Sequence, residues 1–131
     1  MCQMLLSINP QYVESILQGE KLYEYRKFRC RDDVDKIVIY ATAPQKRVVA
    51  EAEIADIVED DILNVWRKTR EHSGITYTFF RKYYKGKKKA VAYHLKNLVI
   101  YKEPLTLEEI GVPCAPQSFR YISDVIQVGA N

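Results

Sequence analysis

Cysteine, histidine and glycine are scarce in this chain. Its 131 residues include three cysteines, two histidines and five glycines. Cys2, Cys30 and Cys114 are odd in number, widely spaced and free of any Cys-x-x-Cys pair, which is typical of reduced thiols in a cytosolic protein. Because His72 and His94 are also isolated, we expect no zinc site and no other metal. The predicted location is the cytoplasm.

Several motifs that would name a function are also missing. No apolar run approaches the roughly 20 residues needed to span a bilayer, so no membrane association is expected. The start of the chain lacks the charged and apolar regions of a signal peptide. The sequence has neither a glycine-rich phosphate loop nor a Gly-x-Ser-x-Gly nucleophile elbow. We therefore expect no cofactor and no nucleoside triphosphate chemistry.

The length and composition are those of one ordinary globular domain. Apolar residues make up 47% of the chain and charged residues 28%. A net charge of +3 is too small to identify a nucleic-acid-binding protein, so the distribution of charge matters more than its sum. We expect a single domain over residues 1–122 and a frayed tail over residues 123–131, in a monomer or weak dimer.

Hydrophobic patterning predicts mostly strands with a few short helices. Asn9 and Pro10 fit the N-cap and first position of a helix that stops at Gly19. Small residues such as Ala50 and Ala52 indicate a tightly curved sheet. Strands are predicted over residues 4–8, 21–27, 36–41, 47–58, 88–101 (with a bend near 96–97) and 116–122, and further helices over 61–70 and 76–85. This order favours an α+β, mainly β fold.

The polar residues after Gly19 form the first candidate site. Side chains alternate between the two faces of a strand, so Glu24 and Arg26 are predicted to point the same way, with Lys21 at the entrance of the strand. A lysine can hold a phosphate, and an arginine can bind a phosphate or a base edge with two hydrogen bonds. The alternative is a solvated strand face with an ion pair worth about 0–1 kcal/mol. The spacing alone leaves both interpretations open.

Residues 81–89 form a second candidate surface, with six cations and no acid. Interleaved tyrosines could stack on bases while the lysines contact phosphates. The alternative is a solvated helix end whose cations complement the helix dipole. Residues 51–61 carry six carboxylates and no cation, so the molecule is expected to have two oppositely charged sides.

Near the C-terminus, Gln117, Ser118 and Arg120 could hydrogen-bond a ligand, although the same segment could simply close the sheet. Tyr25 and Tyr40 are the best stacking candidates, because both lie on strands near the polar triplet. The candidate ligand-binding residues are Lys21, Glu24, Tyr25, Arg26, Tyr40, Thr42, Gln117, Ser118 and Arg120, with Lys85, Lys87, Lys88 and Lys89 as a basic extension.

The pattern Gly19-x-Lys21-x-x-Glu24-x-Arg26, directly after a short strand and helix, resembles the signature of ASCH domains in the PUA-like superfamily. The apolar segment 36–42, the segment 48–53 and the ending 116–122, which resembles that of one bacterial subgroup, extend the resemblance over roughly residues 3–122. The resemblance implies a PUA-like open β-barrel of five to six mixed strands, with a helix beside a cleft lined by Lys21, Glu24 and Arg26. It also implies RNA binding, in translation- or transcription-linked regulation.

Three functional hypotheses follow from the residues and the resemblance. The first is a small RNA- or nucleotide-binding domain. The second is a hydrolase acting on a modified nucleoside or on RNA, with Lys21 and Glu24 as catalytic residues. One branch of the family deacetylates N4-acetylcytidine with a Lys, a Thr and a distant Glu. Here the Thr position is Glu24, and the distant Glu would fall near Ser73-Gly74, where neither residue is a Glu. The third is a protein-interaction domain that has lost its ligand.

Overall fold

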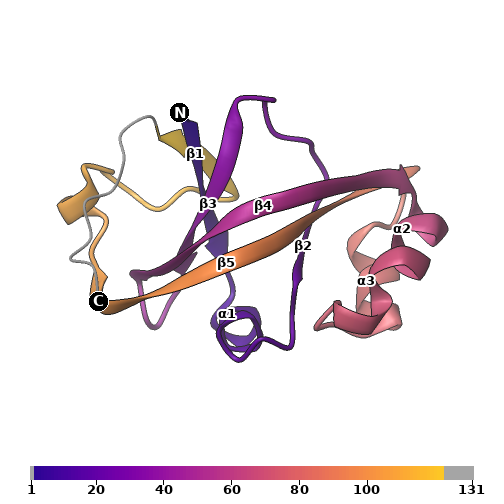
Figure 1. Cartoon of the computed structure of the whole chain (residues 1–131), viewed down its shortest axis with the longest axis horizontal. Coiled ribbons are helices and arrows are strands. Elements are labelled where there is room, and N and C mark those ends of the chain that lie inside the picture. Colours follow the sequence, from indigo (N-terminus) through magenta and orange to yellow (C-terminus); the bar gives the residue numbers. More distant parts are fainter. Residues whose placement is uncertain (1, 123–131) are drawn as a thin grey trace.

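In the part of the chain that the structure describes, six strands form one mixed sheet in the order β2-β5-β4-β3-β1-β6. The computed structural model describes residues 2–122, and Figure 1 shows the path of the chain through the sheet. The strands are β1 (Cys2–Ile8), β2 (Tyr23–Arg26), β3 (Val34–Ala41), β4 (Arg47–Asp61), β5 (Lys89–Leu105) and β6 (Phe119–Ile122). β2 and β6 are the edges, so the sheet is open. The predicted α+β, mainly β fold with six mixed strands is confirmed.

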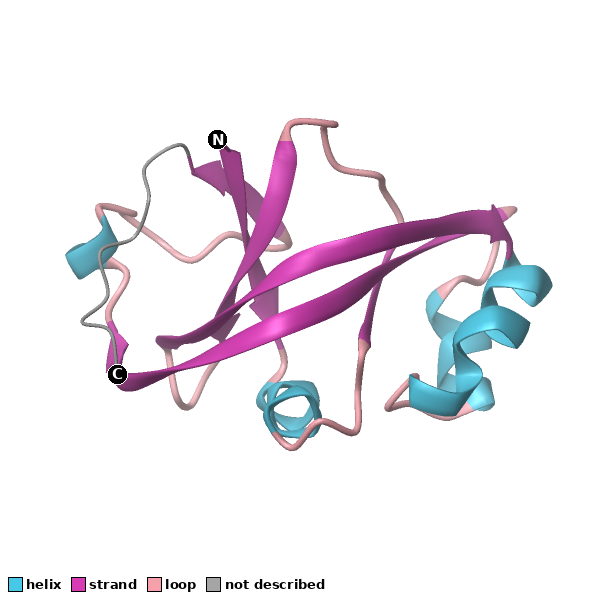
Figure 2. Ribbon diagram, viewed as in Figure 1, coloured by secondary structure: helices cyan, strands magenta, loops and turns pink. Residues whose placement is uncertain are grey.

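β1 and β3 are parallel, and the other neighbouring strands are antiparallel. β4 and β5 form a long ribbon that crosses the whole molecule in Figures 1 and 2. Pairing of Val48 with Leu105 at one end and Asp61 with Lys89 at the other makes both strands longer than the sequence predicts. Asn97, at the predicted bend, has a φ of 51°.

Three short helices and two 3₁₀ turns cover parts of the sheet: α1 (Pro10–Leu17), α2 (Ile62–Thr69), η1 (Arg70–His72), α3 (Tyr77–Tyr83) and η2 (Glu108–Ile110). Side-chain oxygens of Asn9, Asp61 and Thr76 accept backbone N–H groups at the starts of α1, α2 and α3, as expected for N-caps. α2 and α3 pack together at one end of the β4–β5 ribbon (Figure 2). None of the described helices combines the length and the apolar character required to span a membrane.

The buried residues form three groups. The main cluster joins Val13 and Ile16 of α1 to one face of the sheet. The second cluster lies on the opposite face and consists of Leu5, Val38, Tyr40, Val48, Tyr101 and Val112. The helical cluster joins α2 and α3 to the end of the sheet and consists of Tyr25, Val65, Phe80, Tyr84, Ala90 and Ala92. In Figure 1, β2 lies between α1 on one side and α3 on the other. The predicted frayed tail, residues 123–131, lies outside the described residues.

Candidate functional site

The Lys21–Glu24–Arg26 triplet is buried. The residues are 3%, 7% and 8% exposed, respectively. An exposed strand face with a weak surface ion pair, the alternative left open by the sequence, is therefore excluded. Since buried charges are stable in a protein only when they are paired or hydrogen-bonded, the partners of these three side chains define the site.

Glu24 and Arg26 form an ion pair on one face of β2, as the two-residue spacing predicts. Arg26 Nη2 lies 2.9 Å from Glu24 Oε2, and Arg26 Nε donates to the same oxygen at 3.0 Å. Arg26 Nη1 donates to Ser118 Oγ at 3.2 Å and more weakly to the Ser118 carbonyl oxygen at 3.5 Å. Arg26 Nη2 also donates to the Ser7 carbonyl oxygen at 3.0 Å. The five N–H groups of the guanidinium can all be assigned to protein acceptors, and they join β2 to β1 and to the segment before β6.

Lys21 reaches into the same region from the start of β2. Its ammonium donates to the carbonyl oxygen of Ser73 at 2.8 Å and lies 4.8 Å from the centre of the Tyr25 ring. Burial lowers the pKa of Lys21; the nearby Arg26 also lowers it, while Glu24 partly opposes the change. Among residues 2–122 the Ser73 carbonyl is the one hydrogen-bond acceptor of this ammonium, so two of its three N–H groups remain for a ligand.

The loop after η1 is shaped to accept the lysine side chain. Gly74 has a φ of 70°, and a methyl group at its Cα would lie 2.5 Å from Lys21 Cβ. Glycine is therefore required here both by the backbone conformation and by the closeness of the Lys21 methylene chain.

The triplet opens into a cavity of about 180 Å³ between β2, α1 and α3. Aromatic rings supply much of its wall. The lining residues are Ser7, Ile8, Asn9, Tyr12, Lys21, Glu24, Tyr25, Arg26, Ile75, Phe79 and Tyr83. Burial, with a smaller effect of Glu24, raises the pKa of the Tyr12 hydroxyl; burial also raises that of Tyr83. Both hydroxyls therefore stay protonated at neutral pH and are able to donate hydrogen bonds.

Tyr25 contributes its ring to the cavity and its hydroxyl to the helical cluster. The hydroxyl donates to Thr69 Oγ1 at 2.7 Å, and Thr69 in turn donates to the Val65 carbonyl oxygen. Burial raises the pKa of Tyr25 to about 12. This tyrosine therefore ties the floor of the cavity to α2.

The structure separates the other predicted site residues. Ser118 meets Arg26, but Gln117 and Arg120 are exposed and do not line the cavity. Tyr40 is buried in the second cluster, on the face of the sheet away from the main cluster. Thr42 follows β3, and its backbone N–H donates to Ile8.

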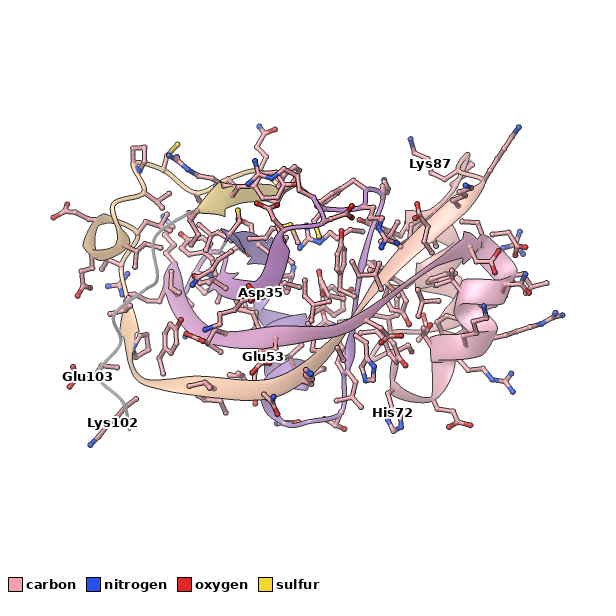
Figure 3. The ribbon with its side chains drawn as sticks, turned by 45° about the horizontal axis from the view of Figure 1, so that its top comes forward. Asp35, Glu53, His72, Lys87, Lys102 and Glu103 are labelled. Carbon is pink, nitrogen blue, oxygen red and sulfur yellow. The ribbon has the colours of Figure 1, made fainter. Side chains whose placement is uncertain are left out.

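The basic extension lies in the turn between α3 and β5. Lys85, Lys87, Lys88 and Lys89 are exposed, and Figure 3 shows Lys87 at one end of β5, far from Lys102 at the other. Lys27 follows β2, and its Nζ lies 4.6 Å from the centre of the Tyr83 ring. Because Tyr83 also lines the cavity, this contact connects the cavity to the same end of the sheet. Lys89, the first residue of β5, lies opposite Asp61 in the register of β4 and β5.

Several parts of the site were not predicted from the sequence. They are the lining residues Ser7, Ile8, Asn9, Tyr12, Ile75 and Phe79, and the Ser73-Gly74 loop that contacts Lys21. Tyr83, one of the tyrosines predicted to stack in the basic segment, also lines the cavity. The sequence does contain two signals for these parts of the site. Tyr12 precedes Val13 on a helix whose buried stripe is clear, and Ser73-Gly74 marks a break between helices. Their approach to Lys21 depends on the long-range packing of α3 against β2, which local patterning does not contain.

Known proteins are similar to this chain in sequence and in fold. A family model described as a domain of unknown function (DUF365) matches residues 4–123. An ASCH domain-containing ribonuclease of Zymomonas mobilis is 28% identical over 96 residues, covering 72% of this chain and 65% of that protein. A large ribosomal subunit protein uL22 of Ureaplasma parvum is 28% identical over 120 residues, covering 91% of this chain. The chain spans 39% of the length of that ribosomal protein. It thus covers less than two thirds of either relative.

Solved structures of an ASCH domain are also similar to this chain. The crystal structure of ASCH from Z. mobilis superimposes with a TM-score of 0.83 and 27% identity, covering 92% of this chain and 87% of that one. A tyrosine-to-phenylalanine variant of the same protein gives a TM-score of 0.83 and 26% identity, covering 92% of this chain and 90% of that one. The resemblance to ASCH domains predicted from the sequence is confirmed.

Proposed function

The chain belongs to the DUF365 family and has the fold of an ASCH domain, and from this premise we propose that it binds single-stranded RNA by taking one nucleotide into the cavity beside β2. The observation that carries the proposal is a buried lysine and a buried carboxylate that open into a cavity walled by aromatic rings. The Z. mobilis relative is named as an ASCH domain-containing ribonuclease, which supports RNA as the ligand.

The site residues have distinct roles in this proposal. The rings of Tyr12 and Tyr83 contact the face of the base, because aromatic rings stack on any nucleobase. Lys21 donates to a phosphate or to a base acceptor. Arg26 binds only Oε2 of Glu24, so within the described chain Oε1 remains to accept an N–H group of the base. Arg26 has its donors occupied by protein oxygens and is therefore a positioning residue, which orients Glu24.

The basic extension adds attraction for the phosphates outside the cavity. Lys85, Lys87 and Lys88, together with Lys27, lie toward one end of the sheet, and Tyr83 links them to the cavity. Binding of phosphates by exposed lysines releases counterions, so the affinity should fall as salt rises. The cytoplasm is the proposed location, because the described thiols of Cys2, Cys30 and Cys114 are all free.

RNA cleavage is a second candidate function, and the lowered pKa of Lys21 favours it. A neutral Lys21 amine could remove the proton from a ribose 2′-hydroxyl. The 2′-oxygen would then attack the adjacent phosphorus and displace the 5′-oxygen of the next nucleotide. That oxygen would take a proton from the Lys21 ammonium or from water, leaving a 2′,3′-cyclic phosphate. Acylcytidine hydrolysis has less support, because the Thr of that branch is replaced by Glu24, which is held by Arg26.

The test is RNA binding by wild type and by Lys21→Met, measured by fluorescence anisotropy of a labelled single-stranded RNA. The control variant is Lys102→Met, which removes an exposed lysine at the far end of β5. We expect wild type and Lys102→Met to bind with an affinity that falls steeply between about 50 and 200 mM salt, and Lys21→Met to bind at least roughly tenfold more weakly. Equal binding by folded Lys21→Met would contradict a role of the cavity. Chromatography of the same RNA after incubation reports cleavage.

A further inference from the structure

A second hollow of about 510 Å³ lies directly beside the cavity. It is open and shallow, and its walls come from the first turn of α1, the loop after η1 and the start of α3. Its lining residues are Gln11, Tyr12, Gly74, Ile75, Thr76 and Phe79. Tyr12, Ile75 and Phe79 also line the cavity, so the two spaces share one wall.

The shared wall is aromatic and exposed. Phe79 is 40% exposed, although it is a large apolar residue at the surface of a helix. Its ring lies 5.5 Å from that of Tyr12, centre to centre, at an angle of 46°. An aromatic pair that stands between two adjoining spaces offers ring surface to a ligand in each of them.

The chemistry of the second hollow fits a nucleobase rather than a phosphate. None of its six lining residues is charged. Gln11 carries an amide and Thr76 a hydroxyl, and the latter accepts the backbone N–H of Phe79 at 3.1 Å. Ring surface with a few neutral polar groups is the composition expected for a site that stacks a base with little hydrogen-bond readout.

Lys21 lies near the boundary of the two spaces. It lines the cavity, and its methylene chain packs against Gly74, which lines the second hollow. Its ammonium is 5.8 Å from the centre of the Tyr12 ring in the shared wall. A cation at this place could meet the phosphate that links two neighbouring nucleotides.

We propose that the second hollow binds the base next to the one in the cavity. The site then recognises two neighbouring nucleotides of single-stranded RNA, with the Tyr12–Phe79 wall between their bases. This inference rests on the proposed function and deepens it. Three observations indicate a neighbouring nucleobase as the ligand of the second hollow. The hollow adjoins the cavity, its lining is uncharged, and Lys21 lies near the boundary of the two spaces.

The experiment compares three ligands by calorimetric or NMR titration: a mononucleotide, an RNA dinucleotide and a dinucleotide in which one residue lacks its base. The abasic residue is placed at either end in turn, which keeps the linking phosphate and removes only the stacking surface. We expect the intact dinucleotide to bind roughly tenfold more tightly than either abasic form, because each abasic form can fill only one of the two spaces with a base.

Phe79→Ala and Tyr77→Ala provide a matched pair of variants. Both residues lie on α3 and are 40% exposed, but Tyr77 packs against Trp66 and Arg81 and does not line either space. We expect Tyr77→Ala to keep the preference for the intact dinucleotide and Phe79→Ala to lose it. Equal affinity of wild type for intact and abasic dinucleotides overturns this inference, while retained mononucleotide binding leaves the proposed function standing. If none of the ligands binds, the proposed function itself fails.

Discussion

Arg26 and Ser118 are 92 positions apart in the sequence, yet the guanidinium Nη1 lies 3.2 Å from the serine hydroxyl. This contact spans the opening between the β2 edge of the sheet and the segment that leads into β6 at the other edge. The barrel-like shape is thus completed here by a side chain. The same guanidinium holds the Glu24 carboxylate at the cavity.

Arg26→Ala should destabilise the fold strongly. It leaves the buried Glu24 without its partner, and breaking one side of a buried pair costs about 3–5 kcal/mol. The control is Arg29→Ala, which removes a half-exposed ion pair to Glu59 at 3.4 Å and should cost about 0–1 kcal/mol. Urea denaturation measures both changes in the free energy of unfolding. Similar losses in the two variants would show that the buried network is not the support that we infer.

Gly74→Ala should displace Lys21 as well as strain the backbone. Gly74 and Gly86 both have positive φ, at 70° and 81°, but only at Gly74 would the new methyl group meet a neighbour. Gly86→Ala therefore reports backbone strain alone, about 1–2 kcal/mol. We expect a larger loss of stability for Gly74→Ala, together with weaker RNA binding, which Gly86→Ala should retain. Equal stability and binding in the two variants would argue against the packing of Lys21 on Gly74.

The burial of Lys21 predicts a pH dependence with a definite sign. Its pKa is lowered in the folded state, whereas an unfolded lysine titrates near about 10.4. Between these two pKa values, Lys21 is protonated more often in the unfolded chain than in the folded one. The contribution of Lys21 to the free energy of unfolding therefore increases with pH.

Wild type should therefore gain stability relative to Lys21→Met as the pH rises from 7 toward about 10. The other ionisable groups are common to both proteins and largely cancel in this difference. Denaturation curves across that range measure it. A difference that stays constant with pH would mean that Lys21 has an ordinary pKa in the folded protein.

Charge reversal in the basic extension should weaken RNA binding without affecting the cavity. Lys87→Glu places an acid in the exposed turn after α3, whereas Lys102→Glu makes the same change at the opposite end of β5 (Figure 3). We expect Lys87→Glu to reduce the affinity for an RNA octamer and the slope of its salt dependence, and Lys102→Glu to change neither. Mononucleotide binding should be the same in both. If the two variants bind the octamer equally, the basic turn does not contact RNA.

Local patterning was sufficient to predict most of the fold. The cap at Asn9, the beginning of α3 close to Thr76, the stop at Gly19 and the apolar run of β3 are each determined within a few residues of sequence. The two-residue spacing of Glu24 and Arg26 likewise predicted their shared face.

The full cavity could not be predicted, because its walls come from segments that meet only through packing. Both faces of β3 are apolar, so the sequence did not show that the face shared by Val38 and Tyr40 is the one that belongs to the second cluster. The role of Ser73 as an acceptor for Lys21 depends on its backbone carbonyl, which no side-chain pattern encodes. Phe79 resembled a core residue, but it stands at the surface between two hollows.

The most direct test of the central claim is a two-dimensional NMR titration of the isotope-labelled protein with a single-stranded RNA trinucleotide at low salt. If the cavity beside β2 is the binding site, the largest shift changes will occur in Lys21, Glu24 and Arg26 and in the cavity-lining parts of α1 and α3. The acidic side of β4 around Glu53 should be unaffected. Changes confined to surfaces away from the cavity, or no changes at all, would contradict the account.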